Sequence, residues 1–414
     1  MRNQGASNGV AGHAGMRRIG VVTTSRADYG GVLPILRAIN ADPDLDLLLF
    51  VGGMHLATEF GLTVKEIEAD GFSITDRIEM APASDTPEAI AQAIGHGVNG
   101  FARSLNRCRP DILVVAGDRY ELLSVACAAL ALGIPLAHVA GGDLTEGAID
   151  NQVRYALTKL SHLHFVVLEE HARRVRQTGE EQWRIFLTGE PALDLLDTIK
   201  LLGREELSAS LGIELKPPIA VVTLHPTTVS ETPVTAQVDA VLSALGRFPG
   251  TLVFTHPNAD AGHRHIADRL HDFVSERPNN VALFFNLGLE RYYSLMALAD
   301  VMVGNSSSGI WEAPSFALPV VNAGERQQGR TRAGNVIDVS FDAGAISEAI
   351  RRALDPRFRA PLRGLANPYG DGHASERIVS VLKRTPVDHR LLHKRFQDIP
   401  VQCAETEVYR LAGL

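Results

Sequence analysis

Cysteine is scarce in this sequence, and other absences beside it narrow the class of protein. Only three cysteines occur among 414 residues, Cys108, Cys127 and Cys403, and no two of them form a CxxC pair. Such spacing argues against a disulfide framework and a structural zinc site, and it is typical of an enzyme kept reduced in the cytoplasm. No apolar run is long enough to cross a bilayer, so we expect no membrane partner.

Two common nucleotide-binding signatures are absent as well. The loop after the first apolar segment reads TTSRADYGG in place of GxGxxG, and the chain contains no GxxxxGK[ST] motif. These absences disfavour redox chemistry with a nicotinamide and hydrolysis of ATP. Two HxH pairs, beginning at His162 and His263, are expected to be core or surface histidines rather than metal ligands. We therefore expect neither a metal nor another cofactor.

The charge balance and the start of the chain give two further expectations. The formal net charge is −8, which argues against a dedicated nucleic-acid binder but leaves room for a local basic pocket for phosphates. The first 15 residues are small and polar without an apolar core, so we expect a disordered leader rather than a secretory signal.

Strand-like and helix-like segments alternate along the chain, and the alternation begins again after about residue 200. The strand-like segments are continuous Val/Ile/Leu runs, which is typical of strands buried on both faces of a parallel sheet. The predicted fold class is therefore α/β, with two Rossmann-like doubly wound domains and a ligand cleft that faces the carboxyl ends of the strands. The expected strands are 17–25, 46–53, 111–118, 134–142, 162–168, 184–189, 218–226, 251–258, 281–286, 300–305 and 318–324.

The same alternation suggests where the domains begin and end. We expect a first domain over residues 16–197 and a second over 198–374, followed by C-terminal helices over 375–414 that pack back on the first domain. The expected helices include 31–39, 289–299, 374–384 and 391–398.

Polar motifs recur at the points where these strands end. Because the carboxyl ends of parallel strands meet at one edge of a sheet, these side chains should gather in one binding cleft. Among them Arg26 can meet a phosphate, and the Gly30–Gly31 pair lets the backbone come close to a ligand. The motifs are Ser25–Arg26, Gly117–Asp118–Arg119, Gly141–Gly142–Asp143, His225–Pro226, His256–Pro257 and Asn305–Ser306.

The segment 301–330, VMVGNSSSGIWEAPSFALPVVNAGERQQGR, carries the strongest functional signal. An apolar strand runs into Ser306 and Ser307, where a helix is expected to begin. Backbone N–H groups, hydroxyls and the positive end of the helix dipole would then point at one spot that suits a pyrophosphate. Glu312 follows within that helix and can accept hydrogen bonds from a ribose diol, and the basic loop from Arg326 to Arg330 can close over the ligand. The alternative is that Ser306 merely caps a core helix, although three consecutive serines exceed what one cap needs.

Four acidic residues follow strands in the first half of the chain. Asp118 lies in AGDRYE, and Asp143, Glu146 and Asp150 lie in AGGDLTEGAID. Several carboxylates near a phosphate site suit proton removal and return on a sugar, because their environments can drive their pKa values apart. The alternative to a role in proton transfer is that Asp150 caps the helix that begins there and pairs with Arg154. This alternative does not explain Asp118.

Taken together, the motifs resemble a known enzyme family. From about residue 17 to 398 the chain is similar, in order, to the hydrolysing UDP-N-acetylglucosamine 2-epimerases of sialic-acid-type biosynthesis. The resemblance implies a glycosyltransferase-B architecture with the active site between the two domains, and catalysis without a metal or redox cofactor. The motifs that carry it are SRADYG, GDRYE, AHVAGGDLTEGAID, RYALTKLSHLHF, HPTT, PNAD, GNSSSGIWEAPS, NAGERQQGR and NPYGDGHAS.

The resemblance implies conversion of UDP-N-acetylglucosamine and water to N-acetylmannosamine and UDP. The nucleotide leaves from carbon 1 while a base removes the proton on carbon 2, which gives a glycal, and water then adds with the opposite stereochemistry at carbon 2. Phosphate-binding groups matter because they stabilise the charge on the departing nucleotide. The resemblance also implies a nucleotide-sugar substrate and assembly as a homodimer or homotetramer.

The resemblance further implies a role for each site residue. Asp118 and Asp150 would be the acid–base carboxylates, Arg119 and Arg154 would position them, and Glu312 would hold the ribose. The phosphate contacts that it implies are Arg26, His225, Ser306, Ser307 and Arg326, with Asn258 nearby.

One position departs from the family pattern. The sialic-acid members read HIEGGE where this chain reads HVAGGD, so Ala140 replaces a glutamate that the family treats as catalytic. Either Asp143, Glu146 or a water takes over its role, or the sugar pocket fits a different substituent. Members that read TEGAID include enzymes acting on 2,4-diacetamido-trideoxy sugar nucleotides with UDP or GDP, which is the alternative substrate class. The remaining alternatives are a non-hydrolysing epimerase, a glycosyltransferase on the same fold and an inactive nucleotide-sugar binding protein.

Overall fold

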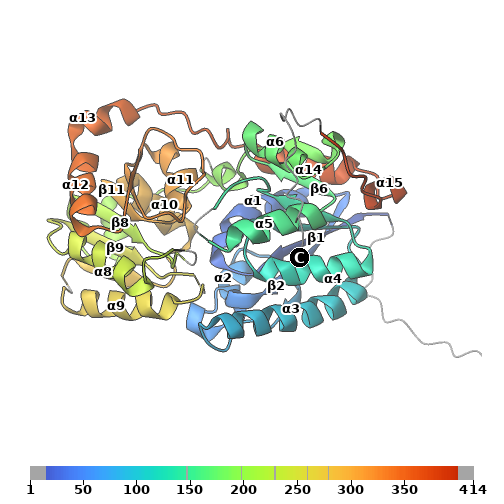
Figure 1. Ribbon diagram of the computed structural model, residues 1–414, viewed down its shortest axis with the longest axis horizontal. Helices are drawn as coiled ribbons and strands as arrows, with labels where there is room; N and C mark the ends of the chain where they lie inside the picture. The colour runs from blue at the N-terminus through green and yellow to red at the C-terminus, as the bar shows by residue number, and fades with distance from the viewer. Residues whose placement is uncertain are drawn as a thin grey trace, which may run out of the picture.

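The computed structural model describes residues 15–399, apart from 146, 147, 197, 228, 229, 259 and 278. Within these residues two parallel sheets form, and each is covered by helices on both faces (Figure 1). The prediction of two Rossmann-like α/β domains in the glycosyltransferase-B arrangement is confirmed. The predicted leader (but for Gly15), Glu146 and Cys403 lie outside the described residues.

The first sheet contains seven strands in the described part of the chain, all paired in parallel. In spatial order they are β3 (Ile74–Ile78), β2 (Leu45–Gly52), β1 (Arg17–Thr23), β4 (Ile112–Ala116), β5 (Leu136–Val139), β6 (Leu163–Val166) and β7 (Ile185–Leu187). The helices between them are α1 (Arg26–Ala41), α2 (Val64–Ala69), α3 (Pro87–Cys108), α4 (Glu121–Leu132), α5 (Asp150–Leu160) and α6 (Glu169–Gln177).

Both faces of this sheet are buried, which explains the continuous apolar runs in its strands. In β4, Ile112 and Val114 pack on the side of α1, whereas Leu113 and Val115 pack on the side of α3, α4 and α5. Successive side chains of a strand point to opposite faces, so a strand with two covered faces needs an apolar residue at every position.

The second sheet contains six parallel strands in the part of the chain that the structure describes. In spatial order they are β10 (Val281–Phe284), β9 (Thr251–Thr255), β8 (Ile219–Thr223), β11 (Val301–Gly304), β12 (Val320–Ala323) and β13 (Val336–Val339). The helices of this half are α7 (Arg204–Leu211), α8 (Val234–Leu245), α9 (His263–Ser275), α10 (Gly288–Leu298), α11 (Ser308–Trp311), α12 (Ala343–Leu354) and α13 (Pro356–Arg359).

The chain passes between the two halves twice. The first passage runs from β7 to α7 and includes Glu190 and the 3-10 helix η4 (Pro191–Leu195), and the second runs from α13 back to α14 (Ala374–Arg384), which packs beside α1 (Figure 1). The two passages meet where the Glu190 N–H donates to the Tyr369 carbonyl oxygen at 2.8 Å. The joint between the halves therefore consists of two segments of chain bonded to each other.

The C-terminal segment lies against the first half of the molecule. Arg17 donates to the carbonyl oxygens of Leu382 at 2.6 Å and Thr385 at 2.7 Å, which ties the end of α14 to β1. Beyond it, the predicted helix over 391–398 is wrong, because only α15 (His389–Leu392) is helical. The buried Arg184 side chain donates to main-chain carbonyl oxygens of this segment, among them Leu391 at 2.8 Å, and these bonds hold it in an irregular conformation. No helix in the described part of the chain is long and apolar enough to cross a membrane.

Candidate active site

A cleft lies between the two halves, at the carboxyl ends of the central strands. Its walls come from the loops after β1, β4 and β5 on one side and from the loops after β8, β9 and β11 on the other. Asp143 and Arg154 do not line it but lie buried directly behind it. The predicted residues that line the cleft are Arg26, Asp118, Arg119, Asp150, His225, Asn258, Ser306, Ser307, Glu312 and Arg326.

A cluster of two aspartates and two arginines lies at the rear of the cleft. The fully buried Arg154 pairs with Asp118, and its Nη1 lies 3.1 Å from Asp143 Oδ2. Arg330 crosses from the second half of the molecule, and its Nε lies 2.8 Å from the same Asp143 oxygen. His171 Nε2 lies 3.3 Å from the other Asp143 oxygen. Asp143 is thus enclosed by cationic and polar groups, whereas Asp118, with 17% of its side chain exposed, faces the cleft.

These arginines keep both aspartates ionised. Burial by itself would raise the pKa of Asp118, but Arg154, Arg330 and Arg326 together hold that pKa below its usual value. The pKa of Asp143 is likewise lowered against the effect of burial, mainly by Arg330 and Arg154. An opposite charge within a few ångströms favours the charged form of a carboxyl group, so Asp118 presents a carboxylate to the cleft at neutral pH.

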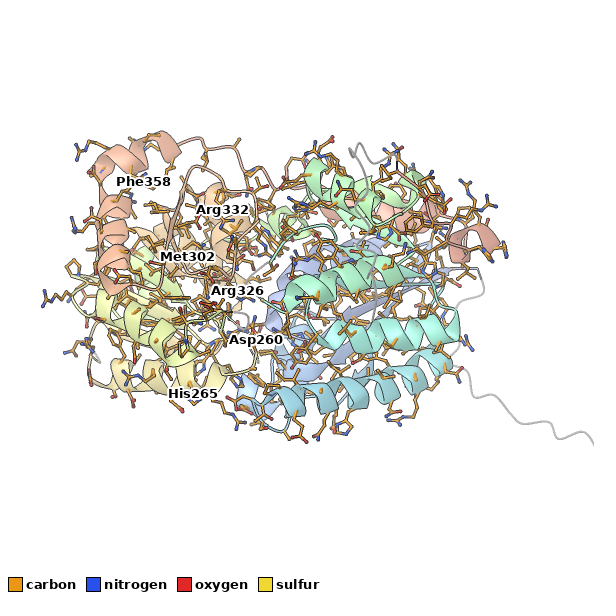
Figure 2. The ribbon with its side chains drawn as sticks, in the orientation of Figure 1. Asp260, His265, Met302, Arg326, Arg332 and Phe358 are labelled. Atoms are coloured by element: carbon orange, nitrogen blue, oxygen red, sulfur yellow. The ribbon has the colours of Figure 1, made fainter. Side chains whose placement is uncertain are left out.

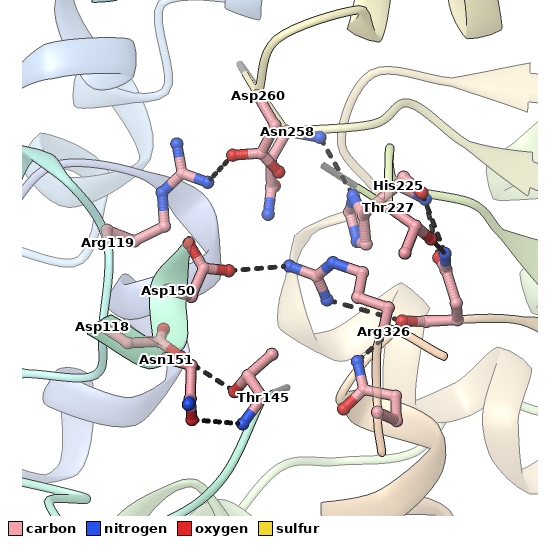
Figure 3. A network of polar contacts seen from close by, with 12 residues as sticks. Asp118, Arg119, Thr145, Asp150, Asn151, His225, Thr227, Asn258, Asp260 and Arg326 are labelled. Carbon is pink, nitrogen blue, oxygen red and sulfur yellow. Dashed lines mark hydrogen bonds and ion pairs between the residues drawn. The ribbon is translucent and has the colours of Figure 1, made fainter. Parts of the chain in front are cut away.

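Asp150 has the opposite environment although it lies in the same cleft. It is the first residue of α5, and its Oδ2 lies 3.3 Å from Arg326 Nη2 of the second half (Figure 3). Burial, together with the negative charges of Asp118 and Asp260, raises the pKa of Asp150 to about 7. The alternative in which Asp150 pairs with Arg154 is not observed, since the ion pairs of Arg154 go to the other two aspartates. One cleft therefore holds two carboxyl groups with well-separated pKa values.

A second ion pair closes the cleft near Asp150. Arg119, which follows Asp118, pairs with Asp260 of the second half (Figure 3). Its Nη2 lies 3.3 Å from Glu121 Oε1. Asp260 was missed by the sequence reasoning, although it ends the PNAD motif that was singled out. It lies 8% exposed, and its charge contributes to the raised pKa of Asp150.

The second half of the molecule supplies a polar wall around His225. The main-chain N–H of His225 donates to Oδ1 of Asn305, which follows β11, at 2.7 Å. The main-chain N–H of Asn258 donates to the ring nitrogen Nδ1 of His225 at 3.1 Å. Burial, with the nearby charges of Arg326 and Arg26, holds the pKa of His225 well below its usual value. A neutral ring whose Nδ1 accepts a hydrogen bond carries its proton on Nε2, which is then a donor available to a phosphate.

The serine-rich segment differs in detail from the prediction. Helix α11 spans only Ser308–Trp311, and Glu312 lies just past its end instead of within it. Ser306 Oγ accepts the Ser308 N–H at 3.3 Å, as a turn residue does, while Ser307 is the N-cap residue of the helix. Both serines line the cleft. Burial raises the pKa of Glu312, while the Ser308 hydroxyl that donates to its carboxyl group acts in the opposite direction.

The loop after β12, which carries Arg326 and Arg330, reaches across the cleft. Arg330 Nη2 donates to Thr145 Oγ1 at 3.0 Å, and its Nε donates to the Leu144 carbonyl oxygen at 3.0 Å. Its guanidinium also lies over the Trp311 ring, 4.7 Å from the ring centre. In Figure 2, Arg326 lies where the two halves of the molecule meet, with Asp260 close by. The loop thus joins the second half of the molecule to the wall that holds the aspartates.

Known proteins match this chain over nearly its full length. The family model described as UDP-N-acetylglucosamine 2-epimerase matches residues 37–383. A protein of Legionella pneumophila named UDP-N,N'-diacetylbacillosamine 2-epimerase (hydrolyzing) is 37% identical over 380 residues, which cover 92% of this chain and 99% of that protein. A Campylobacter jejuni protein named GDP/UDP-N,N'-diacetylbacillosamine 2-epimerase (hydrolyzing) is 36% identical over 385 residues, again 92% and 99% of the two chains.

Solved structures show the same fold. The UDP-GlcNAc 2-epimerase from Neisseria meningitidis bound to UDP-GlcNAc superposes with a TM-score of 0.75 at 17% identity, covering 89% of this chain and all of that one. The Methanocaldococcus jannaschii UDP-GlcNAc 2-epimerase in complex with UDP-GlcNAc and UDP gives a TM-score of 0.72 at 17% identity, covering 88% and 99% of the two chains. The chain therefore belongs to the UDP-N-acetylglucosamine 2-epimerase family, among its hydrolysing nucleotide-sugar members.

Proposed function

We propose that the protein hydrolyses and epimerises a nucleotide-linked 2,4-diacetamido-2,4,6-trideoxy sugar, releasing UDP or GDP and the free sugar inverted at carbon 2. The observation that carries the reaction type is the cleft in which an ionised Asp118 and an Asp150 of raised pKa face arginines and serines suited to a pyrophosphate. Enzymes that move protons at neutral pH commonly hold two carboxyl groups in such contrasting environments.

The first chemical step is an elimination. Asp150, whose pKa of about 7 lies near the working pH, takes the proton from carbon 2 in its ionised form. The electrons of that C–H bond form the double bond between carbons 1 and 2, and the bond from carbon 1 to the phosphate oxygen breaks with its electron pair on the nucleotide. The Asp118 carboxylate stabilises positive charge that builds on the sugar ring as the nucleotide leaves.

The second step adds water across the new double bond. A proton from water joins carbon 2 on the face opposite Asp150, which inverts that carbon, and a water molecule then adds its hydroxyl group to carbon 1 and gives up its own proton. The proton that Asp150 removed passes to solvent, which restores the ionised form of Asp150 for the next turnover. The nucleotide is held by Arg26, His225 and the serines at the end of β11, with Glu312 on the ribose. Arg326 contacts Asp150 in the ligand-free cleft, and a bound pyrophosphate would compete for the same guanidinium. Loss of that contact raises the pKa of Asp150 and makes it a stronger base.

The choice of sugar rests on the relatives and on Ala140. The sequence alone favoured UDP-N-acetylglucosamine, with the diacetamido sugar as the alternative. The two relatives described above carry names that specify diacetylbacillosamine nucleotides, which supports the alternative. Ala140 lies in the cleft wall with a buried methyl group, in contact with an apolar cluster where the sialic-acid members have a glutamate. A small apolar residue leaves room for the bulkier substituent of the diacetamido sugar.

Proton NMR in deuterated water tests the proposal. The full chain is incubated with the UDP- and GDP-linked diacetamido sugars and with UDP-GlcNAc, without metal or acceptor. We expect free sugar that carries deuterium at carbon 2 and an equal amount of nucleoside diphosphate from a diacetamido substrate. Turnover of UDP-GlcNAc alone would refute the choice of sugar. Absence of turnover with all three substrates would refute the reaction, and turnover only after addition of an acceptor would indicate a glycosyltransferase.

A further inference from the structure

Glu190 is a buried acid in the cleft wall that the mechanism above does not use. It lies at the N-terminus of η4, beside the joint between the two halves, and it is only 3% exposed. Its backbone is fixed on both sides, because its N–H donates to the Tyr369 carbonyl oxygen at 2.8 Å and its carbonyl oxygen accepts the Leu193 N–H at 3.1 Å. Its side chain lines the cleft.

The carboxyl group of Glu190 has only one weak partner among the described residues. Its Oε1 accepts the Ala192 N–H at 3.3 Å, whereas its Oε2 is buried without a hydrogen-bond partner. Buried polar atoms in folded proteins are nearly always hydrogen-bonded, so an unpartnered carboxyl oxygen at a cleft wall calls for a partner in a ligand.

The surroundings of Glu190 keep it protonated. Burial, reinforced by the negative charges of Glu312 and Asp143, raises the pKa of Glu190 to about 8, while Arg330 acts in the opposite direction. Tyr293, the remaining ionisable group that faces it, has its own pKa raised well above the usual value, so it is neutral. At neutral pH Glu190 is therefore mostly a carboxylic acid, and its O–H can donate a hydrogen bond.

The position of Glu190 is on the part of the cleft where the sugar is proposed to bind. It lies near Glu312, expected at the ribose, and near Asp143, which backs the reacting aspartates, since both charges act on it. It also shares a wall with Ala140, because Ala140 packs in one apolar cluster with Leu193 and Tyr369, the two residues bonded to the Glu190 backbone.

We propose that the Glu190 carboxyl group contacts the bound sugar and donates a hydrogen bond to the carbonyl oxygen of an acetamido group. It then supplies an acidic hydrogen-bonding group on the wall where Ala140 provides none. This inference rests on the proposed function, since it requires a nucleotide sugar in the cleft. Glu190 is in this view a substrate-recognition residue, and the proton transfers remain with the aspartates.

Two substitutions of Glu190 separate hydrogen bonding from packing. Glu190→Ala removes the donor, and we expect kcat/KM for the diacetamido substrate to fall about 10- to 100-fold at pH 7. Glu190→Gln keeps a hydrogen-bond donor on a side chain of the same shape, and we expect its kcat/KM to stay within about threefold of that of the unmodified enzyme. UDP affinity, measured by calorimetry, should be unchanged in both variants, because the contact is to the sugar. Glu214→Gln, on an exposed side chain far from the cleft, is the matched surface control.

The pH profile distinguishes this role from a structural one. Glu190 is protonated below its pKa and loses its donor above it, so kcat/KM of the unmodified enzyme should decline as the pH rises above about 8. The amide of Glu190→Gln does not titrate, so this decline should be absent in that variant. Retention of the decline in Glu190→Gln, or unchanged kcat/KM in Glu190→Ala, would overturn the inference.

Binding measurements keep this test separate from the test of the reaction. The affinities for UDP and for the UDP-linked diacetamido sugar are compared by calorimetry in each variant. If the unmodified enzyme binds the sugar nucleotide without turnover, the proposed reaction fails. Glu190→Ala should still lose affinity for the sugar nucleotide relative to UDP, and equal losses for both ligands would overturn the role of Glu190. If the unmodified enzyme does not bind the sugar nucleotide, both proposals fail.

Discussion

Substitution of Arg154 tests the physical basis of the aspartate cluster. Arg154 is fully buried, pairs with Asp118 and lies 3.1 Å from Asp143. In Arg154→Met the two carboxylates stay buried with Arg330 as their main remaining cation. Removal of one partner from a buried ion pair costs about 3–5 kcal/mol, because it leaves an uncompensated charge. For domains of this size that corresponds to a fall in Tm of roughly 6–20 °C.

The pH dependence of this loss gives a sharper test than its size. Both aspartates have folded-state pKa values below the ordinary value near 4, so their pairing stabilises the fold above that pH and is lost as the pH falls through the folded pKa. In Arg154→Met the pKa values of Asp118 and Asp143 rise, because a cation that lowers them is lost. Both groups then become protonated at a higher pH, and protonation removes the cost of the unpaired charge. The difference in free energy of unfolding should therefore be largest near pH 7 and shrink toward pH 4.

Thermal and urea unfolding at several pH values measure this difference. Arg351→Met, at an exposed arginine whose side chain is 72% accessible, serves as the control and should cost less than about 0.5 kcal/mol. A loss below about 1 kcal/mol at pH 7, or one that stays constant with pH, would refute the argument. The variant should also lose turnover at neutral pH, because the pKa of Asp118 rises when its main cation is removed.

Three further substitutions probe the cleft. Asp118→Asn should reduce kcat at least about 1,000-fold in the NMR assay while UDP affinity stays within a few-fold, because the charge that stabilises the transition state is lost. Arg326→Ala should weaken UDP binding about 10- to 100-fold by calorimetry. It should also move the acidic limb of the kcat/KM profile to higher pH, since this arginine lowers the pKa of Asp150. Ala140→Glu should lower kcat/KM for the diacetamido substrate at least about tenfold, with UDP affinity unchanged, because the longer side chain fills the space for the substituent. Full activity of Ala140→Glu on the diacetamido substrate would show that residue 140 does not determine the choice of sugar.

The sequence predicted the interior of the fold better than its edges. Central strands such as β4 are buried on both faces and read as unbroken apolar runs, so their existence and type could be predicted from residues alone. The edge strands β3 and β13 were missed because their exposed faces admit polar residues, as in ITDRI and VIDV. The helix expected over 391–398 failed for another reason, since the carbonyl oxygens of that segment are bonded by the distant Arg184, whose contact no local pattern reveals.

In the site, too, some features could be predicted from the sequence and others could not. The positions of Asp118, Asp150 and Arg326 in one cleft could be predicted, because each follows or lies near the carboxyl end of a parallel strand. Their pairing could not, since the contact of Asp150 with Arg326 joins two halves of the molecule whose relative placement is a tertiary property. Glu190 was missed because it precedes a 3-10 helix outside every motif, and only its buried Oε2, which has no hydrogen-bond partner, marks it.

The two bonded passages of chain between the halves restrict how the cleft can open. A single tether would let one half swing in any direction, whereas two tethers joined by the Glu190–Tyr369 hydrogen bond define a single axis of rotation. We expect parts of the wall next to that axis to move little, whereas contacts farther away, such as those of Arg326 with Asp150 and of Arg119 with Asp260, must break for the cleft to open. We therefore expect the cleft to open for product release by rotation about this axis. The part of the wall beside the axis, which includes Glu190, should keep its shape from one turnover to the next.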